Sequence, residues 1–177
     1  MSTYTAAETA RKALQLAWNG ALPVDPVAIA QGIVMYRDDP VTGRRIEMPI
    51  YVRPLSTHQL GGLSGRASMQ QAPEICFFCD YNSDEISYRN RFTIAHELGH
   101  VLLGHVNEGK PMLRDSSFQN YDPPETAANT FAAELLMPEH KVRELFRSVR
   151  TIQELSEIFV VSNPAMTYRL KNLGLIN

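Results

Sequence analysis

The pentapeptide His96-Glu97-Leu98-Gly99-His100 constrains the fold of this chain more than any other feature. In an α-helix, residues four apart lie on the same face, one turn above the other. The two imidazoles can therefore reach one metal ion only if this segment is helical. Such a helix must also lie beside another segment that completes the coordination of the ion.

The residues around this motif predict a buried helix. The segment from Arg91 to Leu103 is apolar over most of its circumference, which is typical of a helix in the interior. Buried polar side chains need partners, so His96, Glu97 and His100 are either hydrogen-bonded core residues or parts of a metal site. The H-E-x-x-H pattern, with its glutamate as general base, is typical of zinc peptidases and favours the metal site.

Two residues are candidates for a third protein ligand, and the first is His105, nine residues after His96. The metzincin pattern requires a histidine at position 106 and a glycine at position 103, where this chain has Val106 and Leu103. The sequence therefore excludes that class. We expect His105 or Tyr121 to contact the substrate or to stabilise the oxyanion instead.

Glu125 is the second candidate. The segment 122–138 predicts a helix with Asp122 as its N-cap and Glu125 in its first turn. Asn129 follows on the same face, where its amide oxygen can accept a hydrogen bond from a ligating imidazole. Two alternatives stay open. Glu125 could cap the helix instead. Glu134 on the same helix could be the ligand in its place, but not together with it, because at about 100° per residue the two side chains point roughly 180° apart.

Two blocks of the sequence resemble the ImmA/IrrE family of metallopeptidases. The first block runs from Arg91 to His100. The second block contains Glu125, the Ala128-Asn129 pair and the run Phe131-Ala132-Ala133-Glu134-Leu135-Leu136-Met137-Pro138. Weaker similarity over residues 23–30 and 155–176 extends the resemblance to most of the chain. The chain departs from the family at Ala127, where a glutamate is frequent, and at Val160, where glycine is usual.

The resemblance implies a zinc endopeptidase core of the gluzincin-like type. It assigns His96, His100 and Glu125 as zinc ligands and Glu97 as the catalytic base. It also implies a cytosolic role in bacteria, their phages or mobile elements. Relatives of this kind cleave helix-turn-helix repressors and so relieve repression, or act in stress responses. We therefore predict a zinc-dependent endopeptidase whose partner is a protein substrate, most simply a helix-turn-helix repressor.

The main alternative is a regulator without enzymatic activity. In that case the zinc site is structural, and the C-terminal part of the chain binds DNA or a repressor protein. A toxin-like component of a two-gene module is a further alternative.

Composition limits the class of protein. A chain of 177 residues, 44% hydrophobic and 20% charged, suffices for one well-buried domain with a small appendage. The net charge of −2 provides no overall basic field for nucleic acid. No apolar run approaches the length of a membrane span, and the N-terminus lacks the pattern of a signal peptide, so we expect a cytoplasmic protein. The only cysteines, Cys76 and Cys79, are expected to be reduced core or half-buried thiols, with redox sensing as the alternative.

The order of elements predicts an α+β fold, in which a small, mostly antiparallel sheet packs on a helical zinc-peptidase core. The helices and strands that precede the motif are expected over residues 5–19, 23–30, 33–37, 46–52, 60–67 and 74–80. We expect the last of these strands, or the segment Gly61–Gly65, to be the sheet edge that pairs with an extended substrate. Residues 108–121 are expected to form a polar loop beside the cleft.

The C-terminal residues 139–177 are expected to form a helical region on a peptidase core of residues 1–138. Thr151 and Ser162 predict the starts of two helices that resemble a helix-turn-helix pair. Residues 139–177 hold six Lys or Arg against four Glu, which is only a small basic excess. The second helix offers few candidate base readers: Tyr168, Arg169, Lys171 and Asn172. DNA binding is therefore not favoured over packing on the core or docking of a protein substrate.

Overall fold

The computed structural model describes residues 4–107, 111–114 and 122–177. In these ranges the helices are α1 (Ala6–Ala17), α2 (Pro26–Gln31), α3 (Ser87–Leu102), α4 (Pro123–Leu136), α5 (Glu139–Phe146), α6 (Ile152–Phe159) and α7 (Asn163–Asn172). The strands are β1 (Val34–Asp38), β2 (Arg45–Leu55), β3 (Gly65–Gln70), β4 (Cys76–Asn82) and β5 (Met112–Arg114). Among the described helices, none has the length and apolar character that crossing a membrane requires.

The described strands form one mixed sheet in the order β1-β2-β4-β3-β5. Neighbouring strands are antiparallel except β2 and β4, which are parallel. This arrangement confirms the predicted α+β fold with a mostly antiparallel sheet. The prediction that the strand over residues 74–80 offers an edge to the substrate is wrong, because β4 is hydrogen-bonded to a neighbour on both sides.

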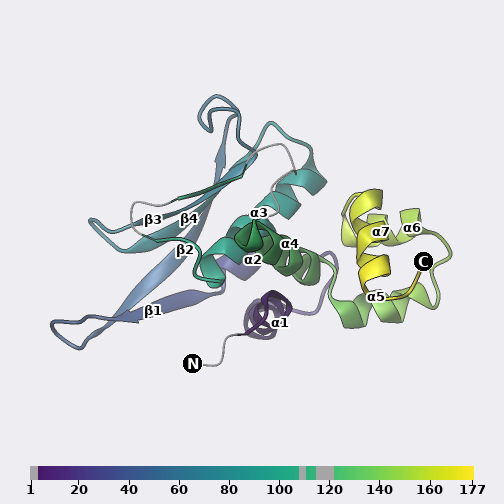
Figure 1. Ribbon diagram of the computed structural model, residues 1–177, viewed down its shortest axis with the longest axis horizontal. Helices are drawn as coiled ribbons and strands as arrows, with labels where there is room; N and C mark the ends of the chain where they lie inside the picture. The colour runs from purple at the N-terminus through teal and green to yellow at the C-terminus, as the bar shows by residue number, and fades with distance from the viewer. Residues whose placement is uncertain (1–3, 108–110, 115–121) are drawn as a thin grey trace.

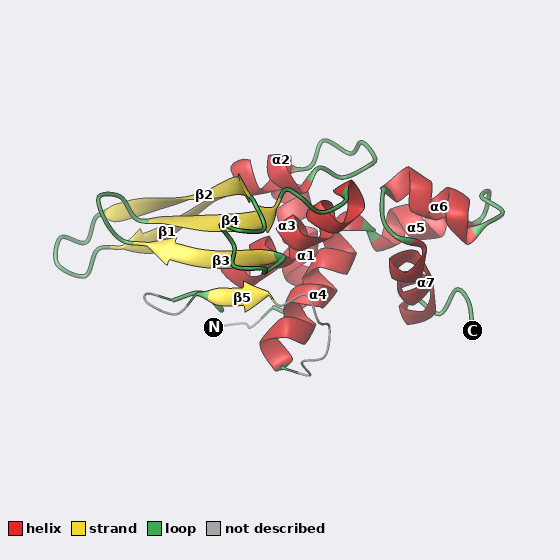
Figure 2. Cartoon of the chain, turned by 90° about the horizontal axis from the view of Figure 1, so that it is seen from above, coloured by secondary structure: helices red, strands yellow, loops and turns green. Residues whose placement is uncertain are grey.

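Helices α3 and α4 connect the sheet to the rest of the molecule. Helix α3 packs on β3 and β4, α4 packs on α3, and α1 packs on α4. Figures 1 and 2 show the sheet at one end of the molecule, α1 to α4 in the middle and α5 to α7 at the other end. Leu98, Phe131 and Leu135 have no exposed surface and lie in the core. The helix that carries the motif is therefore an interior element, as predicted.

Side-chain caps explain where several helices begin. Thr5 and Thr151 accept backbone hydrogen bonds in capping boxes at α1 and α6, and Ser162 caps α7. These three helices match the predicted ones. Asp25 caps α2, which therefore begins at Pro26 rather than at residue 23.

Two segments of the β region differ from the prediction. The strand predicted over residues 60–67 begins only at Gly65, because Gly61 and Gly62 adopt φ values of 63° and 88° and form a turn. Gly65 itself pairs with β5, so the segment 61–65 is not the open edge that we predicted. The loop predicted over residues 108–121 contains strand β5, and residues 108–110 and 115–121 lie outside the described ranges.

The C-terminal helix pair, α6 and α7, forms where the capping signals predict it. Val160 ends α6 with a φ of 51°, in the left-handed region. β-Branched residues rarely adopt this conformation, whereas glycine adopts it at little cost. The departure from the family pattern at this position therefore places a strained residue in the turn between the two helices.

Candidate metal centre

Helix α3 directs two imidazoles at one point. His96 and His100 lie one turn apart and are each only 1% exposed. Their Nε2 atoms lie 3.0 Å apart, and their rings meet edge to face with centroids 4.7 Å apart. Two ring nitrogens at this distance repel each other unless a proton or a cation lies between their lone pairs. The pair is therefore suited to sharing one cation.

Helix α4 adds a carboxylate from its first turn. Glu125 Oε2 lies 3.2 Å from His96 Nε2, and Glu125 Oε1 lies 3.1 Å from His100 Nε2. The ligand atoms of the three residues all lie within 4.8 Å of one another. Both carboxylate oxygens thus face the imidazoles, which favours the ligand alternative over the capping one. Two imidazoles and a carboxylate are the protein donors of several catalytic zinc sites, so these residues fit a divalent ion.

The far nitrogen of His96 contacts Asn129. His96 Nδ1 and Asn129 Oδ1 lie 2.9 Å apart, as the spacing of Glu125 and Asn129 on one helix face predicts. The amide oxygen can only accept, so Nδ1 donates its proton and the lone pair of Nε2 is left facing Glu125. Asn129 is therefore placed where it favours the tautomer that a metal ligand needs.

The far nitrogen of His100 contacts His105, which the spacing did not predict. The two Nδ1 atoms lie 3.0 Å apart. Gly104, with φ 74°, turns the chain back after α3, and the His105 amide donates to the His100 carbonyl oxygen. Burial lowers the pKa of His105, which favours the neutral ring, and the neutral ring can accept a hydrogen bond from the His100 Nδ1–H group. The glycine after the helix is the one sequence signal that could have revealed this contact.

Glu97 points from α3 toward the sheet. Its side chain has no exposed surface. Gly65, the first residue of β3, approaches it so closely that a Cβ atom at this position would lie 2.8 Å from Glu97 Oε1. The carboxylate of the predicted base therefore lies between the backbone of α3 and that of β3. Glu97 directly follows His96 in the sequence.

Three further residues that the sequence singled out are Tyr121, Cys76 and Cys79. Tyr121 belongs to the undescribed residues, so its suggested contact with the oxyanion stays a prediction. Cys76 and Cys79 are buried free thiols, as expected. Burial raises the pKa of both, most strongly for Cys79, so both thiols stay protonated near neutral pH.

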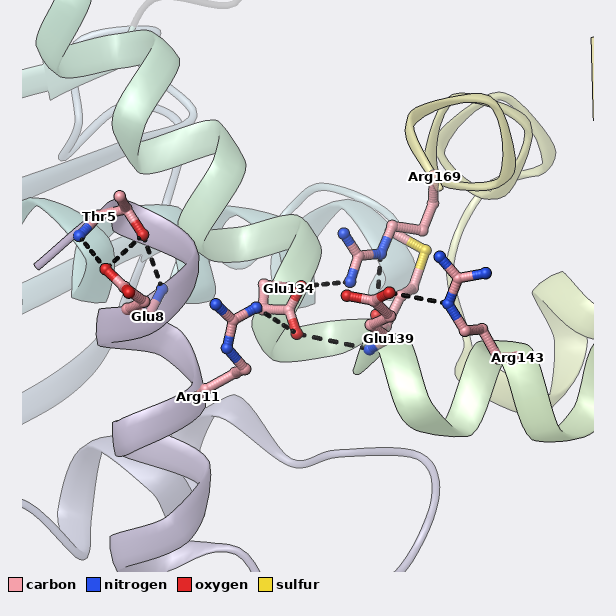
Figure 3. Close-up of polar contacts among 8 residues, drawn as sticks. Thr5, Glu8, Arg11, Glu134, Glu139, Arg143 and Arg169 are labelled. Carbon is pink, nitrogen blue, oxygen red and sulfur yellow. Dashed lines mark hydrogen bonds and ion pairs between the residues drawn. The ribbon is translucent and has the colours of Figure 1, made fainter. Parts of the chain in front are cut away.

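Glu134, the rival ligand on α4, lies in a separate polar cluster at the other end of that helix (Figure 3). Its carboxylate binds the guanidinium of Arg169 from α7, and Arg11 of α1 lies 3.7 Å away. Arg169 Nε also donates to the carbonyl oxygen of Met137 at 3.0 Å. Arg169 is only 8% exposed, so it is not available as the DNA contact that the sequence suggested.

Comparison with known proteins places this geometry in a family. Residues 69–171, more than half of the chain, match the family described as IrrE N-terminal-like domain, Peptidase_M78. The matched region contains the whole cluster of His96, His100 and Glu125. The chain is also similar to Uncharacterized immunity region protein 2 of Bacillus phage phi105, with 33% identity over 93 residues. The alignment covers 52% of this chain and 57% of the phage protein, so the chain spans little more than half of that relative.

Proposed function

The chain belongs to the IrrE N-terminal-like family of metallopeptidases (Peptidase_M78), and on this premise we propose that it is a zinc-dependent endopeptidase. His96, His100 and Glu125 hold the zinc ion, and Glu97 is the catalytic base. The convergence of these three ligands beside the buried Glu97 is the observation that carries the proposal. Asn129 supports the site through its contact with His96.

The reaction is hydrolysis of a peptide bond. When bound, zinc supplies Lewis acidity that polarises the scissile carbonyl and makes water easier to deprotonate. Glu97 takes a proton from the attacking water while the water oxygen bonds to the carbonyl carbon. The protonated Glu97 then gives this proton to the amide nitrogen as the C–N bond breaks, which regenerates the base.

We propose a helix-turn-helix repressor as the protein substrate, cleaved in the cytoplasm in a phage, mobile-element or stress response. The family resemblance supports this choice, and so does the name of the phage relative, which calls it an immunity region protein. Residues 1–138 would form the peptidase core and residues 139–177 a helical region packed on it. The buried pair of Glu134 and Arg169 supports this packing.

Co-expression with a helix-turn-helix repressor, sought first among the neighbouring genes, tests the proposal. The wild-type protein should convert the repressor to fragments, and a zinc chelator should block cleavage by the purified protein. Glu97→Gln should retain one zinc per chain and lose cleavage by about 10²–10⁴-fold. His96→Ala should lose both zinc and cleavage.

Glu144→Gln is the matched control, because it makes the same chemical change in an exposed ion pair with Lys141. It should cleave at the wild-type rate. If Glu97→Gln cleaves as fast as Glu144→Gln, the assignment of the base is wrong. Salt-dependent DNA binding that a chelator leaves unchanged, with the repressor intact, would favour the non-enzymatic regulator instead.

A further inference from the structure

Strand β3 touches α3 at Gly65, directly beside the proposed base. Gly65 lies against Thr93 and Glu97, which are four residues apart on one face of α3. Thr93 and Glu97 both have no exposed surface. This contact joins the sheet to α3 directly beside the Glu97 carboxylate.

Gly65 leaves no space for a side chain. A Cβ atom would clash with Cγ2 of Thr93, would lie 2.8 Å from Glu97 Oε1 and would lie 3.0 Å from the carbonyl oxygen of Asp80 on β4. Gly65 also pairs with Tyr81 of β4 on one side and with Arg114 of β5 on the other. Because hydrogen bonds hold the strand on both sides, it cannot simply move away from α3.

Thr93 contacts Gly65 through its methyl group. In the part of the chain that the structure describes, its buried Oγ1 has no hydrogen-bond partner, whereas its Cγ2 faces Gly65. Thr93→Ser therefore removes the Thr93 atom that lies nearest to a new Cβ. It leaves the contact with the Glu97 carboxylate unchanged.

We propose that Gly65 is a positioning residue, whose bare backbone forms the wall that fixes the Glu97 carboxylate for proton transfer. This inference rests on the proposed function, since it assumes that Glu97 is the base. A general base must lie within hydrogen-bond reach of the proton that it takes, and a displacement of about 1 Å can cost about 100-fold in rate. The three atoms nearest to a methyl group at Gly65 belong to Thr93, Glu97 and Asp80, so the methyl group acts on Oε1 rather than first on the three ligands.

The test compares Gly65→Ala with the double variant Gly65→Ala/Thr93→Ser. The single variant should lose stability and should lower kcat for repressor cleavage by about 10–100-fold, with KM and zinc content close to wild type. The double variant should regain the part of the stability that the clash with Cγ2 costs, but kcat should stay low, because the close contact with Glu97 Oε1 remains. If kcat recovers together with stability, or if Gly65→Ala keeps the wild-type kcat, Gly65 only supports packing and the proposal is overturned.

Gly32→Ala is the matched control. A Cβ there would lie 2.8 Å from the Cβ of Ala17 and 3.2 Å from the carbonyl oxygen of Ala28, so a side chain is also crowded, although less than at Gly65, and the crowding lies between α1 and α2. It should lower stability and leave kcat unchanged. An equal loss of kcat in Gly32→Ala would mean that crowding anywhere in the fold impairs cleavage, which would contradict a specific function of Gly65.

Crystal structures of the metal-free wild type and of the double variant separate this inference from the proposed function. The Glu97 carboxylate should be displaced away from β3 in the double variant. If the wild type cleaves no repressor but the displacement is seen, the proposed function fails and the positional claim stands. An unmoved carboxylate overturns the positional claim, whether or not the wild type is active.

Discussion

Helix α4 carries one glutamate near each end, and the two carboxylates have different kinds of partner. Glu125 faces two imidazoles, whereas Glu134 binds the guanidinium of Arg169. An arginine is permanently charged and supplies only donors, so it neutralises Glu134 by itself. Neutral imidazoles bring lone pairs and no charge, so the group around Glu125 is completed by a cation. The type of partner distinguishes a candidate ligand from a structural carboxylate.

The two glutamates also differ in their exposure to solvent. The Glu125 side chain is 20% exposed, whereas the Glu134 side chain is 3% exposed. A site that exchanges ions and substrate must remain open to solvent. A structural ion pair can be buried, but it stabilises the fold only while both charged partners are present. The comparison predicts that replacement of Glu134 lowers the stability of the fold, whereas replacement of Glu125 lowers the affinity for the metal.

Replacement of Glu134 should have the largest effect on stability. Glu134→Ala leaves the buried Arg169 without its acidic partner and should lower the free energy of unfolding by about 3–5 kcal/mol. Chemical denaturation of the metal-free protein measures this change. The double variant Glu134→Ala/Arg169→Met should regain most of the loss. A stability of Glu134→Ala within about 1 kcal/mol of wild type would contradict the structural assignment.

Replacement of Glu125 should affect the metal instead. Zinc binding of about 10–16 kcal/mol, shared among the three protein ligands, gives about 3–5 kcal/mol for one ligand, so Glu125→Ala should weaken zinc binding by about 100-fold or more. Competition with a chromogenic chelator measures the affinity. The metal-free variant should unfold within about 1 kcal/mol of wild type. Equal zinc affinity in Glu125→Ala and wild type would remove Glu125 from the ligand set.

Asn129 lies between the two glutamates on α4 and should have a smaller effect on the metal. Asn129→Ala removes the acceptor for His96 Nδ1 and should weaken zinc binding by about 10–100-fold. Asn129→Asp keeps an acceptor oxygen and should bind zinc more tightly than Asn129→Ala. Equal affinities of these two variants would show that the hydrogen bond does not orient the imidazole.

Replacement of Val160 should have the smallest effect on stability. Val160 lies between α6 and α7, and α7 carries the arginine that binds Glu134. Val160→Gly relieves a left-handed β-branched residue and should raise the free energy of unfolding by about 1 kcal/mol, in part offset by the greater freedom of glycine in the unfolded chain. Thermal unfolding of the two proteins measures the difference. Zinc affinity should not change, because Val160 is remote from α3. A stability loss would show that packing of the valine outweighs the backbone strain.

Local helix geometry allowed the sequence to predict much of the candidate site. The four-residue spacing of His96 and His100 puts both imidazoles on one face, and the nine-residue spacing of Glu125 and Glu134 puts those carboxylates on opposite faces. The apolar pattern predicted α1, and the capping residues Thr151 and Ser162 predicted where α6 and α7 begin. These features depend on residues within one or two turns, so the sequence alone determined them.

Only the tertiary structure decided which distant segments meet. It placed Gly65 against Glu97 and Arg169 on Glu134, and it set the strand order with β4 in the middle. The three-residue strand β5 is too short to show a period in the sequence. Such contacts join residues whose spacing along the chain has no fixed relation to distance, because they result from packing of whole elements rather than from the repeat of one helix or strand.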